Sequence, residues 1–130
     1  MAFTKRIKYS VLGDGESFEY EATYSGGSAV RLQEAIAGSS TNVELAFALL
    51  LAGLQCLVIS SNVAMTIKTN SSGAPDDTLA LVANVPYVWR IGGGVNNLIT
   101  QDITALFVTV AGSTAGELRI EAIADPTPPA

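Results

Sequence analysis

The sequence predicts an all-β protein, a small jelly-roll-like β-sandwich of roughly eight short strands, the number typical of a double-sheet jelly roll. Three observations lead to this fold class. Apolar and polar residues alternate with a period of two in several segments. Clusters of Gly, Asn, Ser and Pro separate these segments. The length of 130 residues suits a single domain.

The alternating segments are expected to be strands with one buried face, because successive side chains of a strand point to opposite sides of a sheet. Residues 18–24 alternate from Phe18 to Tyr24. Residues 63–69 place Val63, Met65 and Ile67 inward, and residues 117–122 place Leu118 and Ile120 inward with their charges outward. Turn residues cluster between these strands at 13–15, 25–28, 70–77, 92–94 and 112–113.

The segment 42–54 fits two structures. Residues 41–44, Thr-Asn-Val-Glu, match a capping box, and the apolar run after them is rich in helix formers, which favours a buried helix. The same residues fit a strand that leads into a short helical turn near residues 50–54. We prefer the strand and turn, because the chain weakly repeats a unit of turn, strand, loop and strand.

The organisation we expect is one β-sandwich domain over residues 1–125, with a basic N-terminal segment, and a Pro-rich exposed tail at 126–130. Proline has no N–H donor and a fixed φ, so the tail cannot join a sheet. It is either a frayed end or an arm on a neighbouring subunit. The apolar run 45–54 is shorter than the ~20 residues that a spanning helix needs, so no membrane contact is predicted.

The composition argues against several function classes. Seven basic residues face twelve acidic ones, for a net charge of −5, which disfavours nucleic-acid binding. The sequence has no histidine and one cysteine, Cys56, so it offers neither a Cys/His zinc site nor a Ser-His or Cys-His nucleophile. The carboxylates at 14–16 and 76–77 lack the spacing of a calcium loop. We therefore predict no enzyme, no catalytic residue, no metal and no cofactor.

Three basic residues gather near the N-terminus. Lys5, Arg6 and Lys8 leave only four basic residues for the rest of an acidic chain. A basic end on an acidic body can be steered to an acidic partner. The alternative is an edge strand that charge protects from mispairing.

A second candidate surface is the segment Tyr87-Val88-Trp89-Arg90, where Tyr87 and Trp89 fall on one face of a strand. These two rings could belong to the core, to a subunit interface or to a sugar-stacking platform. Tyr, Trp and Arg are enriched at interface hot spots, so Tyr87, Trp89 and Arg90 are candidates for an oligomer interface.

Low charge supports a role in an assembly. Charged residues make up 15% of the chain, where about 25% is usual. Much of the surface of a domain this small is exposed, so many exposed residues must be small or apolar. Interface cores are depleted in charge, which favours a subunit of an assembly over a solitary domain.

The order of motifs in the second half resembles a family of viral proteins. Lys68-Thr69-Asn70 is followed by Asp77-Thr78-Leu79-Ala80-Leu81, by Pro86-Tyr87-Val88-Trp89, by the stretch from Asp102 to Val108, and by a Leu118-Arg119-Ile120 strand with a Pro-rich tail. This order resembles the capsid decoration, or cement, proteins of tailed bacteriophages. The resemblance covers residues 63–125, and its motifs are mostly core and turn residues.

The resemblance implies a structural protein of the virion. Such a protein would bind the major capsid protein on the capsid exterior and stabilise the assembled shell, with Lys5, Arg6 and Lys8 as candidate capsid contacts. It would be a homo-oligomer, with a trimer favoured over a dimer. The alternative function is a carbohydrate- or receptor-binding module of a phage tail or fibre, which exposed rings at Tyr87 and Trp89 would support.

Overall fold

The computed structural model describes residues 3–13, 16–26, 28–92 and 94–124, and the side chains of 29–92 and 94–124. In these residues it contains β-strands and turns but no helix, and thus no helix suited to crossing a membrane. The strands are β1 (Phe3–Gly13), β2 (Glu16–Gly26), β3 (Ser28–Ile36), β4 (Ser40–Leu45), β5 (Leu54–Ser61), β6 (Met65–Thr69), β7 (Thr78–Leu81), β8 (Tyr87–Arg90), β9 (Leu106–Val110) and β10 (Gly116–Ala124).

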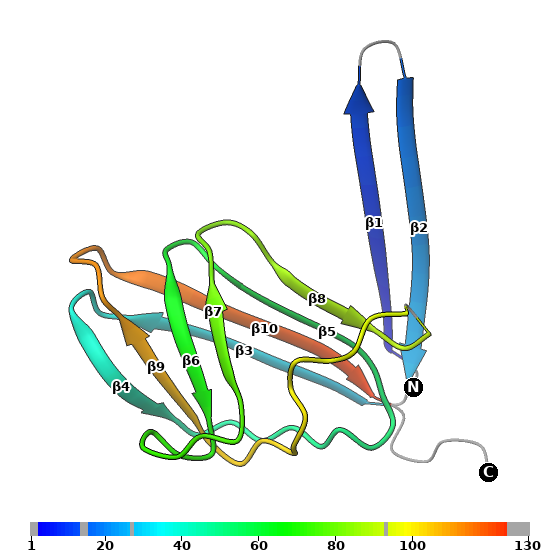
Figure 1. Ribbon diagram of the computed structural model, residues 1–130. Helices are drawn as coiled ribbons and strands as arrows, with labels where there is room; N and C mark the ends of the chain where they lie inside the picture. The colour runs from blue at the N-terminus through cyan, green and yellow to red at the C-terminus, as the bar shows by residue number, and fades with distance from the viewer. Residues whose placement is uncertain (1–2, 14–15, 27, 93, 125–130) are drawn as a thin grey trace.

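Strands β3 to β10 form two antiparallel sheets that face each other (Figure 1). Sheet 1 has the order β3-β10-β5-β8, and sheet 2 has the order β4-β9-β6-β7. Four antiparallel pairs are nested along the chain: β3 with β10, β4 with β9, β5 with β8, and β6 with β7. A long hairpin rolled up in this way is a jelly roll, so the predicted fold class is confirmed.

The core lies between the two sheets and follows the predicted alternation. In β6 the buried residues include Met65 and Ile67, and in β10 they include Leu118 and Ile120. The neighbouring strands supply further members of this layer, among them these buried side chains: Leu57, Ile59, Leu79, Leu81, Leu106, Val108 and Val110. Full burial of one such side chain stabilises a fold by about 1.5–3 kcal/mol. The packed layer therefore holds the two sheets together.

Residues 42–54 form a strand and a turn, not a buried helix. Strand β4 ends at Leu45, and Leu49 then forms an isolated antiparallel bridge with Ile103. The helical turn expected near 50–54 is a reverse turn, in which the Leu54 amide donates to the Leu51 carbonyl at 3.1 Å. Gly53 takes a φ of 77°, which suits the third position of a type II turn and breaks any helical path.

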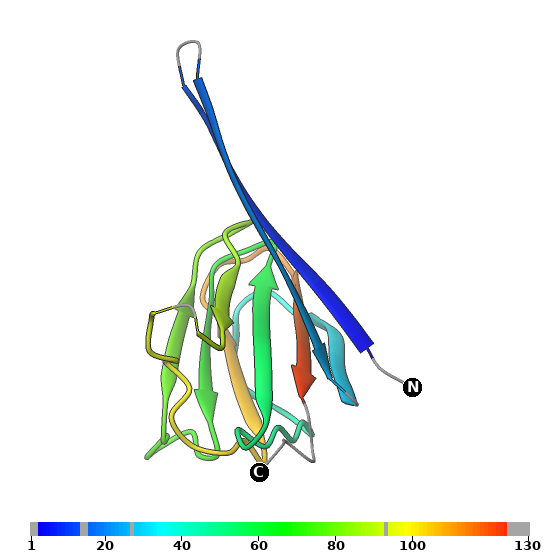
Figure 2. The same ribbon diagram turned by 90° about the vertical axis from the view of Figure 1, so that its right-hand side faces the viewer.

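The sandwich begins at Ser28, later than the expected 1–125 domain. Strands β1 and β2 pair with each other along eleven residues and form a separate two-stranded sheet. This hairpin crosses one side of the sandwich and extends well beyond it (Figures 1 and 2). The predicted strand at 18–24 lies in β2. The Pro-rich tail at 126–130 lies outside the described residues.

Candidate functional site

The β1–β2 hairpin has two chemically different faces, which its register defines. Tyr9 lies opposite Tyr20, and Val11 lies opposite Phe18. By the alternation of the strands, one face carries these mostly apolar residues: Phe3, Lys5, Ile7, Tyr9, Val11, Phe18, Tyr20, Ala22 and Tyr24. The other face carries these mostly polar residues: Thr4, Arg6, Lys8, Ser10, Leu12, Ser17, Glu19, Glu21, Thr23 and Ser25.

This register separates the three basic candidates for a capsid contact. Lys5 belongs to the apolar face, whereas Arg6 and Lys8 belong to the polar one. Lys8 lies directly opposite Glu21. Residues 1–26 hold three basic and four acidic side chains. The N-terminal region is therefore a structured ribbon that is close to neutral, although its first strand alone is basic.

The root of the hairpin packs on the outer face of sheet 1. Strands β1 and β2 contact β10, and β2 also contacts β5. On that outer face, Cys56 is 0% exposed and Ile123 is buried beside it, with Ala29 and Val88 packed around them. A residue on the outside of a sandwich is buried only if another element covers it. We conclude that the hairpin covers this second, smaller apolar cluster.

Tyr87 and Trp89 lie on the inner face of edge strand β8, where both are half-buried against the main core. The Tyr87 hydroxyl donates to Asn97 Oδ1 at 2.5 Å and accepts from the Leu98 amide at 2.9 Å. The Trp89 indole N–H donates to the Val95 carbonyl at 3.0 Å. Both rings thus anchor the loop that follows β8 along the side of the sandwich.

Burial also changes the acidity of this anchor. Burial raises the pKa of the Tyr87 phenol above its ordinary value of 10.0, the hydrogen bond from the Leu98 amide opposes that rise, and the nearby charge of Asp77 adds to it. The phenol therefore stays protonated at neutral pH and keeps its donor for Asn97.

The three residues predicted to form an oligomer interface do not lie on one surface. Arg90 lies on the opposite, outer face of β8, across from Cys56, so it does not share a surface with the two rings. The exposed residues at this edge belong instead to the loop: Val95 is 74% exposed, Leu98 57% and Ile91 49%. These three residues were not predicted as a surface from the sequence, although large apolar residues around a Gly-rich turn could have indicated one.

Asn70, in the loop between β6 and β7, ties two loops together. Asn70 has a φ of 69°, and its amide donates to Asp76 Oδ2 at 2.7 Å and to the Asp102 carbonyl at 2.8 Å. Its carbonyl oxygen accepts from the Thr104 amide at 2.7 Å and from the Thr104 hydroxyl at 3.0 Å. These bonds join the β6–β7 loop to the segment before β9.

Asp77 makes a second tie between the same two regions. Its carboxylate accepts from the amide of Thr100 and from the Thr100 hydroxyl, both at 2.8 Å. A longer bond from the Gln101 amide measures 3.4 Å. Asp76 and Asp77 therefore serve as structural acceptors. No group of three acidic, His or Cys side chains in the described part of the chain could hold a metal.

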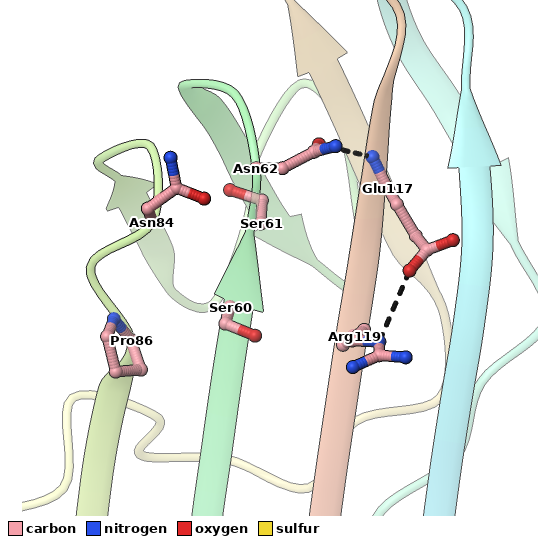
Figure 3. A pocket seen from close by; sticks show the side chains of 7 residues that line it. All are labelled: Ser60, Ser61, Asn62, Asn84, Pro86, Glu117 and Arg119. Carbon is pink, nitrogen blue, oxygen red and sulfur yellow. Dashed lines mark hydrogen bonds and ion pairs between the residues drawn. The ribbon is translucent and has the colours of Figure 1, made fainter.

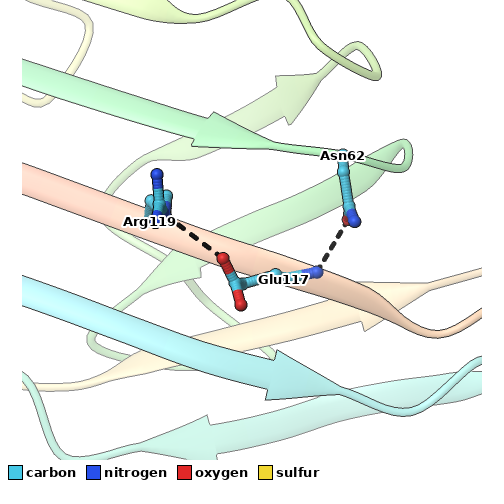
Figure 4. Close-up of polar contacts among 3 residues, drawn as sticks. All are labelled: Asn62, Glu117 and Arg119. Carbon is cyan, nitrogen blue, oxygen red and sulfur yellow. Dashed lines mark hydrogen bonds and ion pairs between the residues drawn. The ribbon is translucent and has the colours of Figure 1, made fainter.

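An open polar groove of about 380 Å³ lies at one end of sheet 1 (Figure 3). Its lining residues are Ser60, Ser61, Asn62, Asn84, Pro86, Glu117 and Arg119. Asn62 Oδ1 accepts from the Glu117 amide at 2.8 Å, and Arg119 Nε lies 3.2 Å from Glu117 Oε1 (Figure 4). The ion pair is well exposed, so it contributes little to stability.

No family model, curated protein or solved structure matches the chain.

Proposed function

We propose that this chain is a capsid decoration protein that binds the major capsid protein on the exterior of a bacteriophage shell and stabilises it, as a homo-oligomer. The observation that carries the proposal is the projecting hairpin on a small jelly roll (Figure 1). A two-stranded hairpin is marginally stable alone in water. An arm of this kind therefore suits a protein whose working state is an assembly.

The composition supports the same role. A charge-poor surface suits repeated contacts with neighbours, because interface cores are depleted in charge. On a shell, each copy needs a moderate affinity only, because linked contacts at fixed geometry reinforce one another. The function requires binding and no chemistry.

The basic candidates at the N-terminus enter the proposal as part of the arm. Arg6 and Lys8 share its polar face, and Lys5 lies on the apolar face. Removal of residues 1–8 would also leave β2 without its partner over Glu21–Gly26. A cleaner test replaces Lys5, Arg6 and Lys8 by Gln, which should weaken sedimentation with capsids that lack the protein. Glu19→Gln on the same hairpin is the matched control, and equal binding of both variants would contradict a basic contact.

The alternative, a carbohydrate- or receptor-binding module, draws on the open polar groove at the end of sheet 1. Its predicted stacking platform is not favoured. The polar atoms of Tyr87 and Trp89 are engaged by the loop after β8, and both rings pack against the core. A sugar would have to bind through Asn62, Asn84 and Arg119 instead. We therefore keep the decoration protein as the main proposal.

The deciding experiment is quantitative mass spectrometry of gradient-purified virions from the source of this sequence. We expect a copy number near that of the major shell protein, or a simple fraction of it. A few copies per particle would transfer the protein to a tail or fibre and call for sugar-binding assays of an Arg119→Ala variant. Complete absence from virions would refute both proposals.

A further inference from the structure

The open polar groove lies on the outer face of sheet 1, away from the root of the hairpin. The root covers Cys56 and Ile123, whereas the groove lies around Ser60 and Arg119. Ile123 and Arg119 are four residues apart along β10, a distance of about 13 Å at roughly 3.3 Å per residue. The groove is therefore separate from the surface that the hairpin covers.

A small side chain between larger ones creates the hollow. Ser60 of β5 pairs with Arg119 of β10, and on its other side Pro86 precedes the first residue of β8. Figure 3 shows Ser60 between these two neighbours. Adjacent strands are about 4.8 Å apart, so the main chains at Pro86 and Arg119 are separated by about 10 Å. The volume of about 380 Å³ falls within the ~300–1,000 Å³ that is usual for small-molecule sites.

The groove presents polar groups that the protein itself does not use. The side chains of Ser60 and Asn84 make no hydrogen bond with the part of the chain that the structure describes. The position of Asn84 is nevertheless fixed, because its main-chain amide donates to the Ser61 carbonyl at 2.8 Å. A group that is held in place loses little conformational freedom when a ligand binds.

Asn62 and Arg119 also keep donors for a ligand. Asn62 uses its side-chain oxygen on the Glu117 amide, which leaves its NH₂ group without a partner among the described residues. Arg119 uses Nε on Glu117 Oε1, which leaves both Nη groups for a ligand. The second carboxylate oxygen of Glu117 remains as an acceptor. The groove therefore offers donors and acceptors side by side.

These groups favour a neutral ligand that is rich in hydroxyl groups. Glu117 offsets the charge of Arg119 within the groove, and the chain carries a net charge of −5, so an anion is disfavoured. A hydroxyl group both donates and accepts, which matches a mixed lining. An extended peptide is disfavoured because β5 and β10 already have a paired strand on each side and offer no free edge for strand addition.

We propose that this groove binds a neutral sugar ring. The ring hydroxyl groups hydrogen-bond to Arg119, Asn62 and Asn84, and an apolar face of the ring packs on Pro86. The inference adds a ligand site to the proposed decoration protein and does not depend on capsid binding. It also defines where the alternative binding module would hold its ligand.

The test is a titration of the full chain with the methyl glycosides of glucose, galactose, mannose and N-acetylglucosamine, followed by amide NMR spectra. We expect at least one glycoside to shift the amide signals of Ser60, Asn62 and Arg119 to saturation, while those of Cys56 and Ile123 stay unchanged. Sodium phosphate and sodium acetate are the anion probes. Shifts with these anions and with no glycoside would overturn the ligand class, and no saturable shift with any probe would overturn the site.

Three variants connect binding to the groove. Ser60→Leu fills the hollow and should weaken binding at least about tenfold, because the ring then loses its place between the larger side chains. Asn84→Gly removes one amide and keeps the turn, because glycine adopts the φ of 61° found there, and it should weaken binding by about threefold to tenfold. Thr66→Leu is the matched control, since Thr66 is also a half-buried hydroxyl residue on the outer face of a sheet, and it should bind as the native chain does.

Equal affinity of the native chain, Ser60→Leu and Asn84→Gly for the bound glycoside would overturn the inference. None of these measurements involves a capsid. Sugar binding by a protein that is absent from virions would refute the decoration function and leave this site intact.

Discussion

Replacement of Asn70 by Ala tests whether the motif residues act as structural ties. Asn70 uses both donors and both lone pairs of its side-chain amide, on Asp76, Asp102 and Thr104. A typical hydrogen bond contributes a net 0.5–1.5 kcal/mol. The surface groups among these partners can bond to water after the change, so we expect a loss of about 2 kcal/mol from the four bonds together.

The backbone adds a second cost. Asn70 has a φ of 69°, a conformation that Asn adopts more readily than other L-residues do, so Ala at this position costs about 1 kcal/mol more than Asn. The free energy of unfolding should therefore fall by about 3 kcal/mol in Asn70→Ala, by the sum of the two effects. Asn70→Gly should be milder, because glycine adopts a positive φ without strain.

The assay is urea unfolding followed by tryptophan fluorescence, with Asn62→Ala as the matched control. Asn62 is exposed and makes one hydrogen bond, at 2.8 Å to the Glu117 amide, so its loss should cost about 0.5–1 kcal/mol. Hydrogen exchange of the Thr104 amide, which donates to Asn70, should accelerate in the Asn70 variants alone. An Asn70→Ala variant as stable as Asn62→Ala would refute the argument.

Three further predictions concern the loop anchor, the hairpin and a tight turn. Burial raises the pKa of the Tyr87 phenol, so the stability that the protonated phenol contributes is complete below about pH 10 and is lost as the pH rises through the folded-state pKa. When urea unfolding is measured between about pH 9 and 11, the free energy of unfolding should therefore fall less in the Tyr87→Phe variant than in the native chain. Deletion of residues 1–26 should make Cys56 reactive to a thiol reagent, with the intact chain as the unreactive control, because the hairpin covers this side chain; equal protection in both would show that another element buries it. Gly38→Ala should lower the melting temperature, because its Cβ would collide with the main-chain carbonyl of Ser113, whereas Gly112→Ala meets nothing within 4 Å; similar melting of the two variants would contradict this packing.

The local pattern of the sequence was sufficient for the sandwich and for much of its core. Alternation is a property of single strands, so Met65, Ile67, Leu118 and Ile120 could be placed inward before their partners were known. The same pattern could not decide between a helix and a strand at 42–54, because a short apolar run fits both. Pairing of Leu49 with Ile103 and the positive φ of Gly53 resolved it, and both depend on the fold.

The surfaces were decided by the tertiary structure, because a surface is made by residues from distant parts of the chain. The sequence marked β1 as basic, but pairing with β2 brings Glu21 opposite Lys8 and separates an apolar face from a polar one. The sequence also predicted one interface from Tyr87, Trp89 and Arg90. In the fold, the two rings lie on the inner face of edge strand β8, whereas Arg90 lies on its outer face. The composition alone was sufficient to show that the chain is poor in charged residues and has no histidine. Strand pairing, which no local pattern encodes, determined which apolar residues are left for a partner.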